Sequence, residues 1–204
     1  MPLKVSPNDP NHAKLQEDVV KFLTDKGFWI TEDTHHTTMP SPLVHRLSEI
    51  NTPTSLYIRT RADLVAVHHS LNLVIQVEVK TRCGKSPNVA IEAIPLMFHR
   101  EMSSVAVDTL YIYRDPIDPW EFGFWVKEMP TPDALFVPKK WNHRMYQYVT
   151  ALSRSRFPVV KIVESDVEGS GDPYYLWKRD WLKDQVDWRV LIDERIEQER
   201  NRWI

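Results

Sequence analysis

The spacing of hydrophobic and polar residues changes repeatedly along the chain between the helical and the strand period. A helix is predicted over about residues 12–26, because Leu15, Val19, Phe22 and Leu23 lie on one face and Gly27 follows as a stop. Further helices are expected at about 95–102 and 139–155, and from about 179 to the C-terminus. Strand-like runs occur at 28–30, 61–68, 73–81, 88–94, 105–113, 120–128, 157–164 and 173–179. This order predicts one α/β domain over residues 1–204, with a core at about 11–128 and a C-terminal extension at about 130–204.

The extension is expected to end in an amphipathic helix with an aromatic stripe. Trp181, Trp188, Ile192, Ile196 and Trp203 recur at intervals of seven, four, four and seven residues, which places them along one side of a helix. An exposed stripe of this length would promote aggregation, so we expect it to be buried. The body of the protein or a second copy of the chain, as in a homodimer, could cover it.

The clearest strand pair in the sequence is a hairpin that carries three charges. Two β-branched runs flank a polar turn at residues 69–72, and this register sets Asp63 opposite Glu78. Lys80 lies on the same face as these carboxylates, because side chains alternate along a strand. Opposed carboxylates repel each other unless a cation lies between them, and two carboxylates with water are ligands that suit Mg²⁺. The alternative is an ordinary hairpin whose polar face meets solvent.

At these residues the chain resembles a known family. Asp63, fourteen intervening residues and then Glu78, Val79 and Lys80 are similar to the D…ExK core of the PD-(D/E)xK nucleases, which include Holliday-junction resolvases and restriction endonucleases. The resemblance covers about residues 11–115 and implies a restriction-endonuclease-like mixed β-sheet flanked by helices. Ala62 stands where the motif has its proline.

The resemblance implies a Mg²⁺-dependent nuclease that hydrolyses phosphodiester bonds, and we expect a DNA endonuclease. Asp63 and Glu78 would hold Mg²⁺, or Mn²⁺ in its place, with the backbone carbonyl of Val79 as an extra ligand. Lys80 would position or deprotonate the attacking water, or neutralise the phosphate. We expect its replacement by alanine to abolish cleavage with little effect on stability.

Some accessory residues follow from the same resemblance. The family often has a further acid on its first helix, where this chain offers Gln16 and Glu17, although Glu17 points away from the apolar face. Glu92, on a later predicted strand, is a further candidate carboxylate. A basic group near the motif would attract nucleic-acid phosphates; it consists of Arg59, Arg61, Arg82 and Lys85.

Composition limits which binding partners and which cellular compartment are expected. A net charge of −2 argues against a uniformly basic nucleic-acid binder but allows a local basic patch. The single cysteine, Cys83, excludes an internal disulfide, and no apolar run suits a signal or membrane segment, so a cytoplasmic protein without a membrane partner is expected. The polar stretch 31–55 contains His35, His36 and His45, and we interpret it as a loop that touches DNA rather than as a zinc site.

Two other functions remain open at this stage. A nucleic-acid-binding protein on the same fold could have lost catalysis, since the first helix offers no clear acid. An adaptor or structural protein could use the aromatic C-terminal helix as its working surface.

Overall fold

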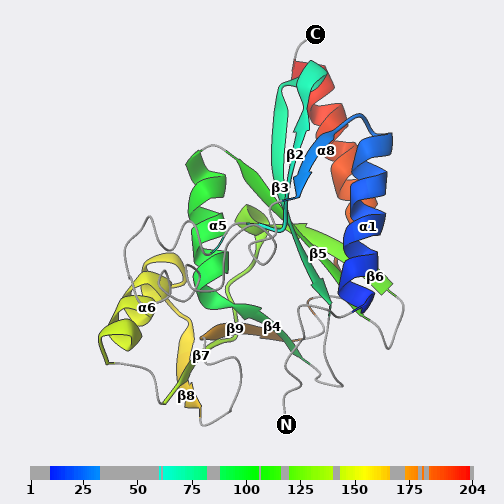
Figure 1. The fold of residues 1–204 in the computed structure, drawn as a ribbon. Coiled ribbons are helices and arrows are strands. Elements are labelled where there is room, and N and C mark those ends of the chain that lie inside the picture. The colour runs from blue at the N-terminus through cyan, green and yellow to red at the C-terminus, as the bar shows by residue number, and fades with distance from the viewer. Residues whose placement is uncertain are drawn as a thin grey trace, which may run out of the picture.

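The chain forms two β-sheets with helices around them (Figure 1). The structure, a computed structural model, describes residues 10–32, 60, 62–81, 88–105, 107–115, 120–139, 143–165, 173–178, 181 and 184–202. The predicted polar stretch 31–55 falls almost entirely outside the described residues.

The larger sheet is mixed and contains the predicted hairpin. Its strands lie in the order β1-β2-β3-β5-β6, with β3 and β5 parallel and all other neighbours antiparallel. Their bounds are β1 Trp29–Glu32, β2 Leu64–His68, β3 Leu73–Thr81, β5 Asp108–Asp115 and β6 Trp120–Trp125. A mixed sheet flanked by helices is the fold class that the sequence predicts.

The smaller sheet combines segments from both halves of the chain. Its order is β4-β9-β7-β8, with bounds β4 Asn88–Glu92, β7 Ala134–Pro138, β8 Lys161–Ser165 and β9 Tyr174–Lys178. The sequence pattern predicts β4, β8 and β9 but misses β7, which separates β8 from β9. Consequently β8 and β9, expected as neighbours in sequence, do not pair with each other.

The hairpin register is confirmed. Leu64 pairs with Val77 and His68 with Leu73, as the symmetry of the two β-branched runs predicts. A short 3-10 turn, His69–Leu71, joins the strands, and Asn72 closes it in the left-handed region at φ 49°. Asparagine tolerates this conformation better than most residues, so the turn chemistry fixes the register.

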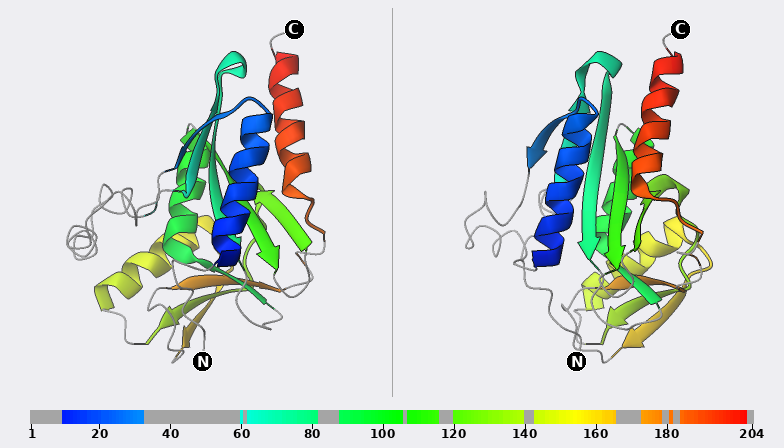
Figure 2. Two further views of the ribbon diagram at one scale, coloured as in Figure 1. Left: turned by 45° about the vertical axis from the view of Figure 1, so that its right-hand side comes forward. Right: turned by 90° about the vertical axis from the view of Figure 1, so that its right-hand side faces the viewer.

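Each face of the larger sheet is covered by different helices (Figure 2). Helices α1 (Pro10–Asp25) and α8 (Trp188–Arg202) pack on the face that carries Ile75, Val77 and Val79. Helix α5 (Ala93–Val105) packs on the opposite face, against Tyr111 and the aromatic side chains of β6. The same second core continues to the smaller sheet and to helix α6 (His143–Arg156). The face of β3 that carries Glu78 and Lys80 is therefore the α5 face.

The C-terminal stripe is confirmed only in part. Trp188, Ile192 and Ile196 are buried against the body of the protein, in the core that α1 also lines. Trp181 lies outside α8 and packs against the other core, so the prediction of one continuous stripe is wrong. The reason is local: Val186 forms a β-bridge with Gly123, and the helix starts only after it. Trp203 lies outside the described residues.

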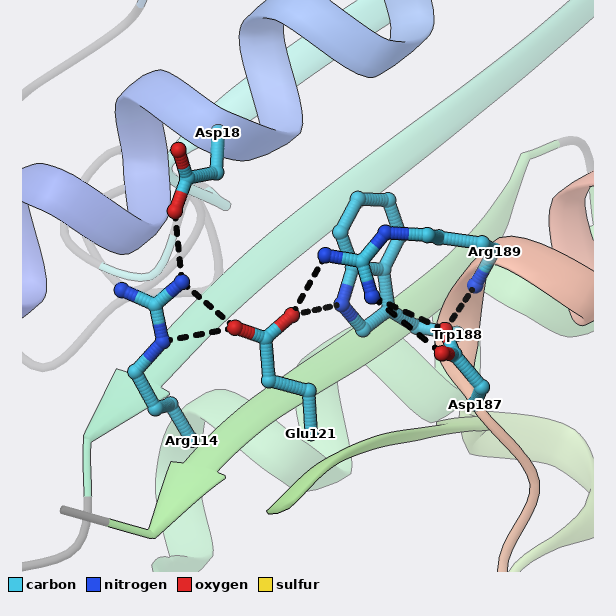
Figure 3. A network of polar contacts seen from close by, with 6 residues as sticks. All are labelled: Asp18, Arg114, Glu121, Asp187, Trp188 and Arg189. Atoms are coloured by element: carbon cyan, nitrogen blue, oxygen red, sulfur yellow. Dashed lines mark hydrogen bonds and ion pairs between the residues drawn. The ribbon is translucent and has the colours of Figure 1, made fainter. Parts of the chain in front are cut away.

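A polar network holds α1, β5, β6 and α8 together at the edge of the apolar face (Figure 3). Glu121 is its centre: Oε1 accepts from Arg114 Nε at 2.7 Å, and Oε2 accepts from Trp188 Nε1 at 3.0 Å and from Arg189 Nη2 at 2.7 Å. Arg114 also reaches Asp18 on α1 at 2.6 Å. Burial opposes ionisation of Glu121, but these donors outweigh it and hold its pKa below the ordinary value.

Candidate active site

The three motif residues gather at the end of the β2–β3 hairpin that is remote from the turn. Asp63 directly precedes β2, while Glu78 and Lys80 project from the α5 face of β3. The paired ladder stops at Leu64 and Val77, so Asp63 lies one step beyond the last pair. The strands thus bring the two carboxylates and the amine to one place, as the hairpin pattern predicts.

Glu78 is buried, which rules out the interpretation of its strand face as an ordinary solvated one. Only 5% of Glu78 is exposed, and its Oε1 forms an ion pair with Lys80 Nζ at 2.6 Å. Its Oε2 is also buried and has no hydrogen-bond partner in the structure described. A buried carboxylate oxygen without a partner is costly, so this position is suited to a ligand that supplies positive charge.

Asp63 is held against the next strand by its own side chain. Its Oδ2 accepts a hydrogen bond from the backbone N–H of Val79 at 2.7 Å. Burial, and after it the negative charge of Glu78, raise the pKa of Asp63 to about 7, although Lys80 and the Val79 amide act to lower it. Near neutral pH the carboxyl is therefore divided between its protonated and ionised forms.

The other two charges respond to the same surroundings in the opposite sense. Burial acts against ionised Glu78, but Lys80 and the amide of Asp63 lower the pKa of Glu78 below its ordinary value. Burial likewise acts against charged Lys80, but Glu78 and Asp63 raise the pKa of Lys80. The site therefore holds one fixed anion, one fixed cation and one carboxyl whose charge depends on what binds.

His99 and Tyr111 lie beside this group, and the sequence pattern gives no sign of them. His99 comes from α5 and is 1% exposed; its Nδ1 lies 2.8 Å from the Tyr111 hydroxyl and its Nε2 lies 2.6 Å from the carbonyl oxygen of Thr60. Tyr111 is the register partner of Glu78 in the parallel β3–β5 pair. Contacts between a helix and a strand depend on tertiary packing, so spacing along the chain could not have revealed them.

The three accessory candidates, Gln16, Glu17 and Glu92, differ in where they lie relative to the motif residues. Glu17 is exposed on α1, which covers the opposite face of the sheet, and half-buried Gln16 lies on the same helix. Among the described residues, Glu17 is not one of the main charges that shift the pKa of Asp63 or of Glu78, and Gln16 carries no charge. Glu92, at the end of β4, is exposed, and its charge raises the pKa values of Asp63 and Lys80. Of the three candidates, only Glu92 is brought near the motif.

Several predicted residues lie outside the described parts of the chain. They are the basic residues Arg59, Arg61, Arg82 and Lys85, the histidines of the 31–55 stretch, and Cys83. Within the described ranges, no three His, Cys, Asp or Glu side chains are grouped so that they alone could hold a metal ion. No described helix has the length and apolar character needed to cross a membrane.

Comparison with known proteins shows a distant structural similarity. No family model matches the chain, and no curated protein does. The fold is similar to that of Hjc, a Holliday junction resolvase from the archaeal hyperthermophile Archaeoglobus fulgidus, with a TM-score of 0.46 and 10% identity over 89% of this chain and 98% of that chain. A match this distant leaves the function to be judged from the site itself.

Proposed function

We propose that the protein is a metal-dependent nuclease of the PD-(D/E)xK type, in which Asp63, Glu78 and Lys80 act as one catalytic unit. The observation that carries the proposal is the buried, unpartnered Oε2 of Glu78 beside a second carboxyl and an amine. A purely structural ion pair would need only Glu78 and Lys80. Asp63 adds a second negative charge at a position where it is unfavourable unless a cation binds.

The donor set fits a hard divalent cation. Asp63 and Glu78 supply carboxylate oxygens, the carbonyl of Val79 is a further candidate, and Mg²⁺ usually keeps water and substrate phosphate in its remaining positions. Two protein carboxylates therefore suffice for such a site. When bound, such an ion would stabilise the negative charge that develops during phosphodiester hydrolysis. Mn²⁺ should replace Mg²⁺.

Lys80 is suited to electrostatic and positioning work. Its raised pKa keeps it protonated at neutral pH, so it would act as a cation and a hydrogen-bond donor rather than as a base. The side chain is 30% exposed, whereas that of Glu78 is 7% exposed. Lys80 can therefore meet a substrate phosphate from solvent while Glu78 stays behind it. This refines the sequence-based expectation, which left open a role in deprotonating water.

The substrate of the proposed enzyme is nucleic acid, and we propose DNA cut internally. A second candidate is a nucleic-acid-binding protein without catalysis on the same fold. It is favoured by one observation: neither Gln16 nor Glu17 on α1 reaches the site as the family's helix acid would. The two functions differ in whether bonds are cut, so a cleavage assay separates them.

The experiment is incubation of the purified protein with supercoiled plasmid, single-stranded DNA, RNA and a four-way DNA junction, in Mn²⁺ or in EDTA. We expect at least one DNA substrate to be cut in Mn²⁺ and none in EDTA, and nicking of a closed circle identifies an endonuclease. Binding without cutting in both buffers would replace the proposal by the second candidate.

A further inference from the structure

Two hydrogen bonds to backbone groups, together with the strand β2 that follows, fix the position of Asp63. One is its own bond to the Val79 amide. The other lies three residues earlier, where the Thr60 carbonyl oxygen is 2.6 Å from His99 Nε2. Between them Ala62 is buried. Asp63 therefore follows a buried residue and lies close in sequence to a second point of attachment, which limits how far its carboxylate can move.

The hydrogen-bond partners of His99 determine its protonation. A carbonyl oxygen only accepts, so Nε2 must carry the hydrogen that points at Thr60. A Tyr111 hydroxyl that donates to Nδ1 makes the imidazole neutral, and burial favours this form because it lowers the pKa of His99. Both groups are buried, with Tyr111 0% exposed, so the bonds are shielded from competition by water.

Since Tyr111 pairs in register with Glu78, the chain of contacts runs from the strand beside Glu78, through His99, to the segment that carries Asp63. We propose that His99 is a positioning residue of the candidate active site: its Nε2–H bond to Thr60 holds the segment that places the Asp63 carboxylate beside Glu78. The role rests on the proposed function, because the position matters only if the two carboxylates share an ion. Helix α5 thereby supplies the helical contribution to the site that α1 does not.

Two neutral amide substitutions separate the two bonds of His99. In His99→Gln the side-chain amide can reach as far as Nε2 and donate to Thr60, but the Tyr111 bond is lost. In His99→Asn the shorter side chain can accept from Tyr111, as Nδ1 does, but the Thr60 bond is lost. Both variants are neutral and each removes one buried bond, so a general loss of stability should affect both alike.

The first readout needs no metal and no substrate: hydrogen exchange of the Val79 amide in the full-length protein. That amide is protected by Asp63, so losing the Thr60 anchor should speed its exchange by about tenfold in His99→Asn, with a nearly unchanged rate in His99→Gln. Equal rates in the two variants, or faster exchange in His99→Gln, would overturn the proposal. If either variant fails to fold, the ¹⁵N spectrum of His99 in the native protein decides: the Nε2–H tautomer is required, and an Nδ1–H or charged ring contradicts it.

The second readout is the Mn²⁺ affinity of the two His99 variants. Mn²⁺ titration by calorimetry should give His99→Gln an affinity close to that of the native protein, and His99→Asn an affinity about tenfold weaker, as is usual when a residue that orients a ligand is removed. Equal affinities would contradict the positioning role. If the native protein binds no Mn²⁺, the proposed nuclease function fails, and Val79 exchange still decides whether His99 positions Asp63.

Discussion

The Asp63 carboxylate accepts a hydrogen bond from the Val79 amide, with 2.7 Å between nitrogen and Oδ2, just beyond the end of the β2–β3 ladder. The side chain thus gives this strand amide an acceptor beyond the end of the paired ladder. It lies close enough to Glu78 for the two negative charges to interact. A single contact thus links the hairpin register to the arrangement of the candidate site.

Asp63→Asn should stabilise the metal-free protein at alkaline pH. The pKa of Asp63 is raised from 3.8 to about 7 in the folded chain, so the folded state binds this proton more tightly than the unfolded state does. Asp63 therefore lowers stability progressively between about pH 4 and pH 7, and this loss is complete above pH 7. Asparagine keeps an acceptor for Val79 without the charge. The free energy of unfolding should rise by roughly 1–3 kcal/mol at pH 8 and change little at pH 4.

Denaturant unfolding in EDTA at the two pH values measures this difference. Asp133→Asn is the matched control, because Asp133 also accepts a strand amide, that of Lys178 at 2.8 Å, but at an exposed site. Its effect should be small at both pH values. Destabilisation of Asp63→Asn at pH 8 would show that the carboxylate is not in conflict with its surroundings, and the metal-site interpretation would lose its electrostatic basis.

Lys80→Met should abolish cleavage while leaving Mn²⁺ affinity equal to or tighter than that of the native protein. The substitution removes a positive charge beside the ion but no proposed ligand, and deleting one electrostatic donor from an active site costs about 10²–10³ in rate. The sequence-based expectation of unchanged stability is revised, because the ion pair with buried Glu78 is lost and a destabilisation of about 1–3 kcal/mol is expected without metal.

Cleavage rates and calorimetry of Lys80→Met are compared with Lys161→Met, which alters an exposed lysine on a strand of the smaller sheet. The control should cut at the native rate. Native-rate cleavage by Lys80→Met itself would remove the lysine from the catalytic unit.

Glu121→Gln should destabilise the fold by roughly 1–3 kcal/mol without affecting metal binding. It weakens the attachment of Arg114 and Arg189, and through them that of α1 and α8, on the sheet face opposite the site. Thermal unfolding and Mn²⁺ titration measure the two effects. Glu164→Gln, an exposed strand position, serves as the control. A large loss of Mn²⁺ affinity in Glu121→Gln would mean that the network belongs to the metal site.

The sequence predicts most of this structure where the decisive contacts are local. The hairpin register follows from two β-branched runs about a turn that Asn72 can close, and the first helix from its apolar spacing and Gly27, which adopts φ +90°. Strand β7 escapes prediction because it ends at Pro138, and proline is an unusual strand residue. The sequence predicts that Trp181 belongs to the same helix as Trp188. This prediction is wrong because the bridge between Val186 and Gly123, a long-range contact, determines where α8 begins. The role of α5 at the site likewise depends on packing.

Mn²⁺ titration of Glu78→Gln tests whether Asp63 and Glu78 share a divalent ion. The substitution keeps the shape of the side chain and removes one of the two charged ligands, so Mn²⁺ affinity should fall by about tenfold or more and cleavage should stop. Glu17→Gln, which changes an exposed carboxylate on α1, should bind and cut as the native protein does. Undiminished Mn²⁺ binding by Glu78→Gln would show that the ion lies elsewhere and would contradict the metal site proposed at Asp63 and Glu78.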